Sequence, residues 1–525
     1  MRRAAAPYDD RMILTAAALA LALPQQPERF PAVPAQDARR YELDLQVDVA
    51  AGTLRGTVDY TFTALEKLSS IRLDARRSED WQVTFTTPAG APLDAAWADD
   101  HCVVTLPEPA AAGTDVRFRA ALAGTPVDGF YFKANRYGAQ MAFTDHYSIR
   151  ARGWLPCEDH PADRAVFATT LRYPRGQEAV VFGLEPEDSA QSVDGWITRR
   201  FVGQSEIPPY MYALVIGPLA RVAEAGDARL QDHFVYPQDV DKAKASLVHH
   251  AAWIAAMEET FGRYPYGKYT TVQCPTRWGG FEAPGNVQLA ERLFDRGGVG
   301  TLAHELVHMW FGDAIGYAAW REVWLSEGFA SYFGPWLHAQ AGGPPLAKSM
   351  AALRARWRKS FEGRTKTVRD DRFAHPDQAL NANTYPKGAW VLHMLRGEVG
   401  DAAFFAALKA YVAQFRGASI TTRDFVACIE EQTGQELSWF FDQWLDRVGC
   451  PTLEVRADGG AIRVRQTHEG APYRCWLRLR WRGACGEPVE RRVRLDGPAT
   501  EVPLDGPCDG LQVDPDAELL FRAAP

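Results

Sequence analysis

The sequence lacks features that would place it in several large protein classes. Its 525 residues carry a net charge of −8 with no block of basic residues, so nothing indicates nucleic-acid binding. The glycine-rich run at 297–300 lacks the Lys-Ser/Thr pair of a phosphate-binding loop, and we interpret it as a bend before a helix. The apolar run at 12–23 is too short to span a bilayer, so no stable membrane insertion is expected.

The same apolar run has the character of a signal peptide. Arg2, Arg3 and Arg11 precede it, and the small residues at 20–22 suit a cleavage site. A Pro- and Ala-rich linker follows to about residue 38. We therefore predict that residues 1–37 form a leader and linker and that the protein is exported, to the periplasm or the extracellular medium. The alternative is a disordered tail on a cytoplasmic protein.

The cysteines are few and unevenly placed. Four of the eight, Cys450, Cys475, Cys485 and Cys508, lie in the last part of the chain. This clustering predicts disulfides there, as in proteins of an oxidising compartment. The alternative is that all eight cysteines are reduced and serve as small core residues.

Hydrophobic periodicity divides the chain into three regions, and its length is too great for one core. Apolar and polar residues alternate from Tyr41 onward, and similar short strands continue to about residue 219, which predicts a large β domain. Helical patterning begins near Asp241 and dominates to about Arg447, and alternation returns after Cys450. The predicted fold is multi-domain α+β, with a β domain at 38–222, a mostly helical domain at 223–447 and a small β-sandwich at 448–525.

The residues that say most about chemistry form a His-Glu-x-x-His string at 304–308. His304 and His308 are spaced i and i+4, so they lie on one helix face and can reach one ion, and neutral imidazole suits zinc. Glu305 projects beside the first ligand, where it can transfer a proton. Glu327, which follows His308 after eighteen residues, is the candidate third ligand. Three protein ligands leave the fourth zinc position for water, which is typical of a catalytic site.

Four further segments accompany this string. They are Trp310-Phe311-Gly312-Asp313, Trp324-Leu325-x-Glu327-Gly328-Phe329-Ala330, Trp278-Gly279-Gly280-Phe281-Glu282-Ala283 and Tyr385-Pro386-Lys387-Gly388-Ala389. In combination, the segments resemble the gluzincin metallopeptidases of the aminopeptidase N and leukotriene hydrolase family. The resemblance covers most of the chain and implies a saddle-like N-terminal β domain, a thermolysin-like catalytic domain and one zinc ion. The large C-terminal helical domain of many family members is not expected here.

The resemblance also implies roles that spacing alone does not assign. Tyr385 would donate its hydroxyl to the oxyanion that develops at the scissile carbonyl. Glu282, in a loop with Gly279 and Gly280, would bind the free α-ammonium of a peptide. Gln140 would contact the substrate from the N-terminal domain.

The sequence departs from the family pattern at three positions. Phe281 and Ala283 stand where the family has methionine and asparagine, and Ser326 replaces a common asparagine beside the third ligand. The change at Ala283 bears on exopeptidase selectivity more than on zinc chemistry. The sequence predicts a zinc aminopeptidase that acts on peptides with a free N-terminus, by attack of a zinc-bound water on the first peptide bond. The alternatives are a zinc endopeptidase, an epoxide-type hydrolase and a non-catalytic binding protein on a peptidase fold.

Overall fold

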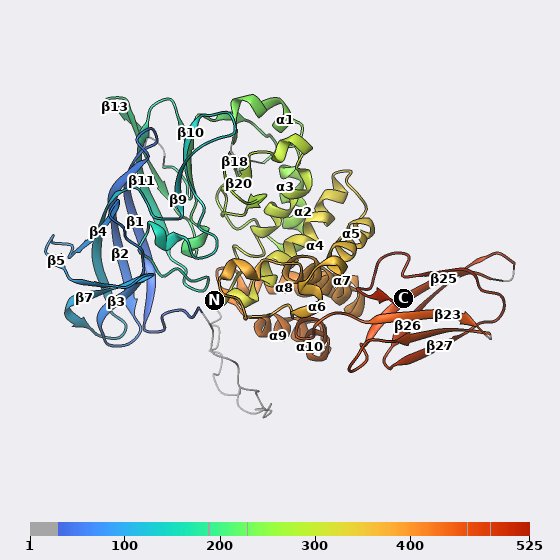
Figure 1. Ribbon diagram of the computed structural model, residues 1–525. Helices are drawn as coiled ribbons and strands as arrows, with labels where there is room; N and C mark the ends of the chain where they lie inside the picture. Colours follow the sequence, from blue (N-terminus) through green and yellow to red (C-terminus); the bar gives the residue numbers. More distant parts are fainter. Residues whose placement is uncertain are drawn as a thin grey trace, which may run out of the picture.

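The computed structural model describes residues 30–186, 190–227, 229–230, 232–458, 460–483 and 485–524. The predicted signal peptide and its cleavage site lie outside the described residues. The chain forms three parts in a row (Figure 1): a β-rich N-terminal part, a mostly helical middle part and a small β-rich C-terminal part. The multi-domain α+β fold predicted from the sequence is thus confirmed. In the described ranges, no helix has both the length and the apolarity needed to cross a membrane.

The N-terminal part is built on an eight-stranded sheet, in the order β13-β14-β11-β1-β2-β8-β4-β5. Strand β1 (Gln36–Asp48) is antiparallel to β2 (Thr53–Ala64) and parallel to β11 (Val166–Pro174). Alternate side chains of β1 from Tyr41 to Val47 are buried, which is the period-two pattern of a strand with one face on a core. The other strands of this sheet are β4 (Trp81–Thr86), β5 (Pro92–Leu93), β8 (Asp115–Gly124), β13 (Gln191–Val193) and β14 (Trp196–Val202).

Two smaller sheets join the N-terminal part. One, in the order β3-β7-β6, contains β3 (Leu68–Asp74), β7 (His101–Ala110) and β6 (Ala95–Trp97). The other, in the order β12-β15-β10-β9, contains β12 (Glu178–Val181), β15 (Leu214–Gly217), β10 (Gln140–Thr144) and β9 (Phe130–Ala134). The second sheet packs on the middle part, because Phe143 shares an apolar cluster with Phe234 and Gln288 donates a 2.9 Å hydrogen bond to the carbonyl of Thr144. The C-terminal end of β10 is therefore fixed against the middle part.

The middle part combines a sheet in the order β16-β17-β18-β20-β19 with a set of helices. The strands are β16 (Ala220–Val222), β17 (His233–Val235), β18 (Thr271–Cys274), β20 (Val287–Ala290) and β19 (Gly280–Phe281), and β21 (Gly316–Tyr317) pairs separately with β22 (Ser419–Ile420). The helices are α1 (Val240–Lys244), α2 (His250–Phe261), α3 (Val299–His308), α4 (Trp324–Gln340), α5 (Leu346–Lys359), α6 (Glu362–Thr365), α7 (Gly388–Val399), α8 (Asp401–Phe415), α9 (Thr422–Thr433) and α10 (Ser438–Leu445). Local sequence sets the helix ends: α9 begins at a Thr421/Asp424 capping box and ends at left-handed Gly434.

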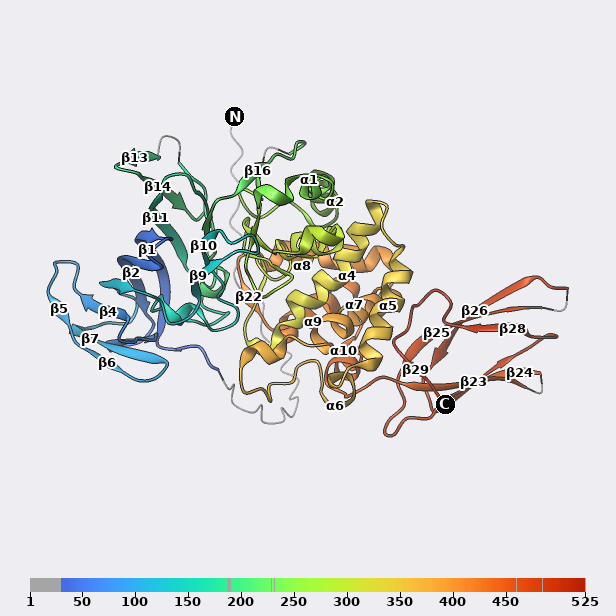
Figure 2. The same ribbon diagram turned by 45° about the horizontal axis from the view of Figure 1, so that its top comes forward.

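The C-terminal part consists of two sheets, which Figure 2 shows beyond α5 and α10. The first has the order β27-β24-β23-β29 and the second the order β26-β25-β28. The strands are β23 (Thr452–Asp458), β24 (Ala461–Gln466), β25 (Cys475–Arg482), β26 (Pro488–Leu495), β27 (Ala499–Pro503), β28 (Asp509–Val513) and β29 (Arg522–Ala523). Ile462 of the first sheet and Leu479 of the second are both fully buried in one apolar core, as expected of a β-sandwich.

The predicted disulfides of this part are wrong. All eight cysteines lie among the described residues, and none of them is bonded to another. Cys475 faces Leu495 across the β25–β26 pair, and Cys450 is buried at the start of the part, whereas Cys485 is exposed. The buried cysteines lie in the apolar clusters and act as small core residues.

Candidate active site

Helices α3 and α4 bring the three predicted zinc ligands together. The Nε2 atoms of His304 and His308 lie 3.3 and 3.5 Å from Oε2 of Glu327 and 3.2 Å from each other. Zinc with nitrogen and oxygen ligands at about 2.0–2.2 Å requires tetrahedral edges of roughly 3.3 Å, so these three donor atoms fit one zinc ion. His308 and Glu327 are buried, and His304 is partly exposed.

Glycines allow the helices to approach closely enough for this geometry. A Cβ on Gly334 of α4 would lie 3.0 Å from the Cα of His304 on α3. A Cβ on Gly328 would lie 3.0 Å from the backbone of Gly388, the first residue of α7. Gly334 and Gly328 therefore let α4 lie close to α3 and to α7, and Glu327 of α4 reaches the two histidines of α3.

Further contacts prepare the ligands to bind a cation. The Nδ1 atom of His308 lies 3.0 Å from the Ser326 hydroxyl and 3.2 Å from the carbonyl of Phe311, so a proton on Nδ1 leaves the Nε2 lone pair free. Ser326, which replaces the family's asparagine, thus keeps a polar contact to a ligand. Burial opposes ionisation of Glu327, but its contacts with the imidazoles of His304 and His308 outweigh burial and lower the pKa of Glu327 to about 2.

Glu305 and Glu282 form a pair of buried carboxyl groups beside the ligands. One oxygen of each carboxylate and one ring nitrogen of His308 lie within 4.8 Å of one another. Burial raises the pKa of both groups. The negative charge of Glu282 raises the pKa of Glu305 further. A Cβ on Gly280 would lie 2.2 Å from Oε1 of Glu305, so glycine at this position of β19 leaves the carboxylate its place. Gly279, its neighbour, is exposed.

Tyr385 reaches the same cluster from a π-helical turn, η7 (Asn383–Lys387), that precedes α7. Its hydroxyl donates a 2.6 Å hydrogen bond to Oε1 of Glu327, and its ring stacks on His304 with centroids 6.1 Å apart. The turn is anchored at its end by Lys387, whose buried ammonium group donates to the carbonyl of Arg447 at 3.0 Å. The structure therefore brings Tyr385 beside the third ligand.

The structure does not bring Gln140 to this cluster, and it adds a residue that the sequence did not indicate. Gln140 is exposed at the first position of β10, whereas the other end of that strand leads toward the site. Beyond it, Tyr147 is buried against Trp278 and Trp320, with ring centroids 5.9 and 5.7 Å away. Burial, followed by the charges of nearby acidic groups that include Glu327, raises the pKa of Tyr147. No spacing rule marks Tyr147, because only the fold of β10 places it here.

A zinc-type donor set on two adjacent helices, with a buried carboxylate and a tyrosine hydroxyl beside it, is an arrangement typical of zinc metallopeptidase sites. Comparison with known families agrees with this class. The Peptidase M1 N-terminal domain profile matches residues 37–211, and the Peptidase family M1 domain profile matches residues 246–444. The chain belongs to peptidase family M1.

Individual relatives have low sequence identity to this chain, but the alignments cover most of it. Aminopeptidase M1-A of Oryza sativa subsp. japonica is 26% identical, over 82% of this chain and 52% of that protein. Aminopeptidase N of Streptomyces lividans is 26% identical, over 91% of this chain and 58% of that protein. The chain thus spans about half the length of the curated relatives it matches. A variant M1 zinc metallopeptidase from Deinococcus radiodurans, solved with a Tyr-Ser-Ala substrate, has a TM-score of 0.66 and 28% identity, over 80% of this chain and 96% of that chain.

Proposed function

We propose that this protein is a zinc aminopeptidase that removes N-terminal residues from peptides. The observation that carries the proposal is the position of Glu282, a buried carboxylate within 4.8 Å of Glu305 and His308. An anion this close to the reacting groups can bind the α-ammonium of a peptide, so that the first peptide bond lies at the metal. The tripeptide bound to the Deinococcus radiodurans relative supports a peptide substrate.

The side chains suit distinct parts of peptide hydrolysis. His304, His308 and Glu327 would hold zinc, which supplies Lewis acidity toward the scissile carbonyl. Glu305 is placed to accept a proton from the attacking water and to pass it to the leaving amine. The Tyr385 hydroxyl would turn from Glu327 to the oxyanion as negative charge develops there. Glu282 fixes the register of the substrate by its terminal ammonium group.

The decisive experiment compares one peptide in free and N-acetylated forms, with products identified by mass spectrometry. A charge-assisted contact is worth about 1.5–3 kcal/mol, so acetylation should lower kcat/KM by roughly 10- to 150-fold. Glu282→Ala should lose a similar factor on the free peptide and should reduce the penalty for acetylation. Equal rates on both forms, or cleavage within the acetylated peptide, would favour the endopeptidase alternative.

We also propose that the protein is exported and that its mature form begins between about residues 22 and 36. The support is the order of arginines, apolar run and Pro-rich linker at the start of the chain. N-terminal sequencing of natively produced protein tests this proposal. Recovery of Arg2 or Met12 as the first residue would contradict it and would favour a cytoplasmic protein.

A further inference from the structure

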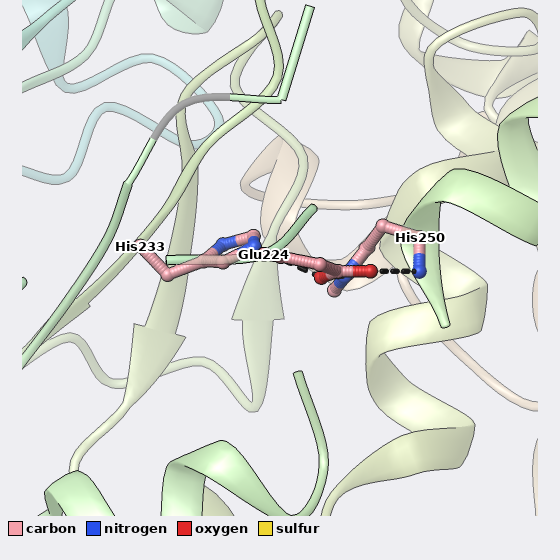
Figure 3. Close-up of side chains that lie close together, drawn as sticks. All are labelled: Glu224, His233 and His250. Carbon is pink, nitrogen blue, oxygen red and sulfur yellow. Dashed lines mark hydrogen bonds and ion pairs between the residues drawn. The ribbon is translucent and has the colours of Figure 1, made fainter. Parts of the chain in front are cut away.

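A second cluster of metal-ligand side chains lies apart from the proposed active site. Glu224 follows β16, His233 is the first residue of β17, and His250 is the first residue of α2. The side chains of both histidines are 0% exposed and that of Glu224 is 4% exposed. Figure 3 shows the carboxylate of Glu224 between the two histidines. These three residues are called the Glu224 cluster below.

One carboxylate oxygen of Glu224 faces both imidazoles. Its Oε2 lies 2.7 Å from Nδ1 of His250 and 3.1 Å from Nε2 of His233. The other oxygen, Oε1, accepts the backbone N–H of His250 at 2.7 Å, which fixes the orientation of the carboxylate. One donor atom from each residue therefore falls within a sphere small enough for one ion, since the three lie within 4.8 Å of one another.

The cluster has the same composition as the trio of His304, His308 and Glu327: two imidazole nitrogens and one carboxylate oxygen. That trio has distances of 3.2–3.5 Å between donor atoms, and the two nitrogen-to-oxygen distances of the Glu224 cluster, 2.7 and 3.1 Å, are shorter. Protons on the imidazoles account for the shorter distances, because they join the atoms by hydrogen bonds. Exchange of these protons for an ion requires the two nitrogen-to-oxygen distances to lengthen from 2.7 and 3.1 Å to roughly 3.3 Å.

The surroundings show what the exchange of protons requires. Nδ1 of His233 accepts the backbone N–H of Thr271 at 3.2 Å and lies 3.0 Å from the Thr271 hydroxyl. Binding of an ion by Nε2 of His233 would move the proton to Nδ1, where the hydroxyl can accept its hydrogen bond in place of the contact with the N–H. In the described part of the chain, Nε2 of His250 has no hydrogen-bond partner, so only Glu224 holds the proton of His250 on Nδ1.

We propose that Glu224, His233 and His250 bind a second zinc ion, which joins the β16–β17 segment to the start of α2. Two imidazoles with one carboxylate favour a borderline ion such as Zn²⁺ over Ca²⁺ or Mg²⁺, which prefer oxygen ligands. Glu224 supplies negative charge against the ion, and the burial of all three side chains strengthens that attraction. The three protein ligands leave the fourth zinc position for a water molecule. The second ion adds stability and takes no part in the proposed peptide hydrolysis.

The test is a count of zinc ions per chain, made by elemental analysis after equilibration with zinc chloride and desalting. We expect two ions in the wild-type chain, one in His250→Gln and one in His308→Ala, which loses the ion of the active site instead. His249→Gln is the matched control, because this neighbouring histidine lies outside the cluster, and it should retain two ions. One ion in the wild type with none in His308→Ala would overturn the proposal, as would two ions in His250→Gln.

Thermal unfolding gives a second test, which does not require enzymatic activity. In the His308→Ala background, zinc should raise the midpoint of thermal unfolding of the metal-stripped chain, since binding to the folded state alone stabilises it. The shift should disappear when His250→Gln is added. A midpoint that does not respond to zinc in the His308→Ala chain would show that the Glu224 cluster is held by shared protons alone.

Discussion

The hydroxyl of Tyr385 donates a 2.6 Å hydrogen bond to Oε1 of Glu327, while Oε2 of the same carboxylate faces His304 and His308. The proposed oxyanion donor is therefore held by the third metal ligand until a substrate competes for it. The hydroxyl must therefore leave Glu327 before it can donate to the oxyanion, and Glu327 keeps it beside the metal ligands until then.

Tyr385→Phe should lower kcat by roughly 10²–10³-fold and leave KM nearly unchanged, because the hydroxyl is proposed to bind only the transition state. Steady-state kinetics on an aminoacyl substrate, with zinc content measured in parallel, provide the check. A variant with altered KM alone would remove Tyr385 from the catalytic residues.

Glu305→Gln should keep its zinc and lose roughly 10²–10⁴-fold in kcat, because glutamine conserves the shape of the side chain but cannot accept the proton. Zinc analysis distinguishes this loss from a loss of metal. Activity within about tenfold of the wild type would show that another group acts as the base.

Gly280→Ala tests the packing of the proposed base. The added Cβ would lie 2.2 Å from Oε1 and 2.5 Å from Cδ of Glu305, so the carboxylate must move. A displacement of this size should cost roughly 10- to 100-fold in kcat with zinc retained. Gly300→Ala is the matched control, since its Cβ would be 3.5 Å from the nearest atom, on His338, and it should behave like the wild type. Equal activities in the two variants would contradict the prediction.

Acid should destabilise the protein through His146. Burial lowers the pKa of His146 to about 4; its Nδ1 lies 3.1 Å from the carbonyl of Pro209, and Trp154 donates to its Nε2 at 2.8 Å. The unfolded chain, with a pKa of about 6.5, binds this proton more readily, so the stabilisation is complete above pH 6.5 and is lost as the pH falls toward 4. Between pH 7 and pH 5, the loss from this residue should be about 2 kcal/mol.

Urea unfolding at the two pH values measures this loss. His146→Gln should show a smaller difference between pH 7 and pH 5 than the wild type, whatever its stability at pH 7. An unchanged difference would mean that His146 does not contribute to the acid sensitivity.

The part of the site that could be predicted from sequence is the part encoded by local spacing. His304 and His308 are one helical turn apart, and any helix through them brings their side chains together. The position of Glu327 is harder to predict. It depends on Gly328 and Gly334, whose lack of side chains lets α4 lie close to α7 and α3. Periodicity carries no such information, so the sequence offers Glu327 only as a candidate third ligand by its position after His308, and the resemblance then supports that role.

Residues joined only by the fold could not be predicted in this way. The resemblance implies Gln140 as a substrate contact, but Gln140 begins β10 at an exposed position, and Tyr147 beyond the other end of the strand is the residue near the site. The Glu224 cluster combines a loop, a strand and a helix that share no periodicity, and it exists only because β17 lies beside the start of α2. The predicted disulfides failed for a related reason, since clustering in sequence does not fix which strands are neighbours.

The buried contact of Lys387 with Arg447 links the turn that carries Tyr385 to a residue that also contacts the small C-terminal part. Arg447 lies over the ring of Tyr473, 4.0 Å from its centroid, and donates to the carbonyl of Ala471 at 2.5 Å. A force or a bound protein that tilts the C-terminal strands would act through Arg447 and Lys387 on the turn that carries Tyr385. The C-terminal strands and the turn that carries Tyr385 thus share Arg447 as a common neighbour.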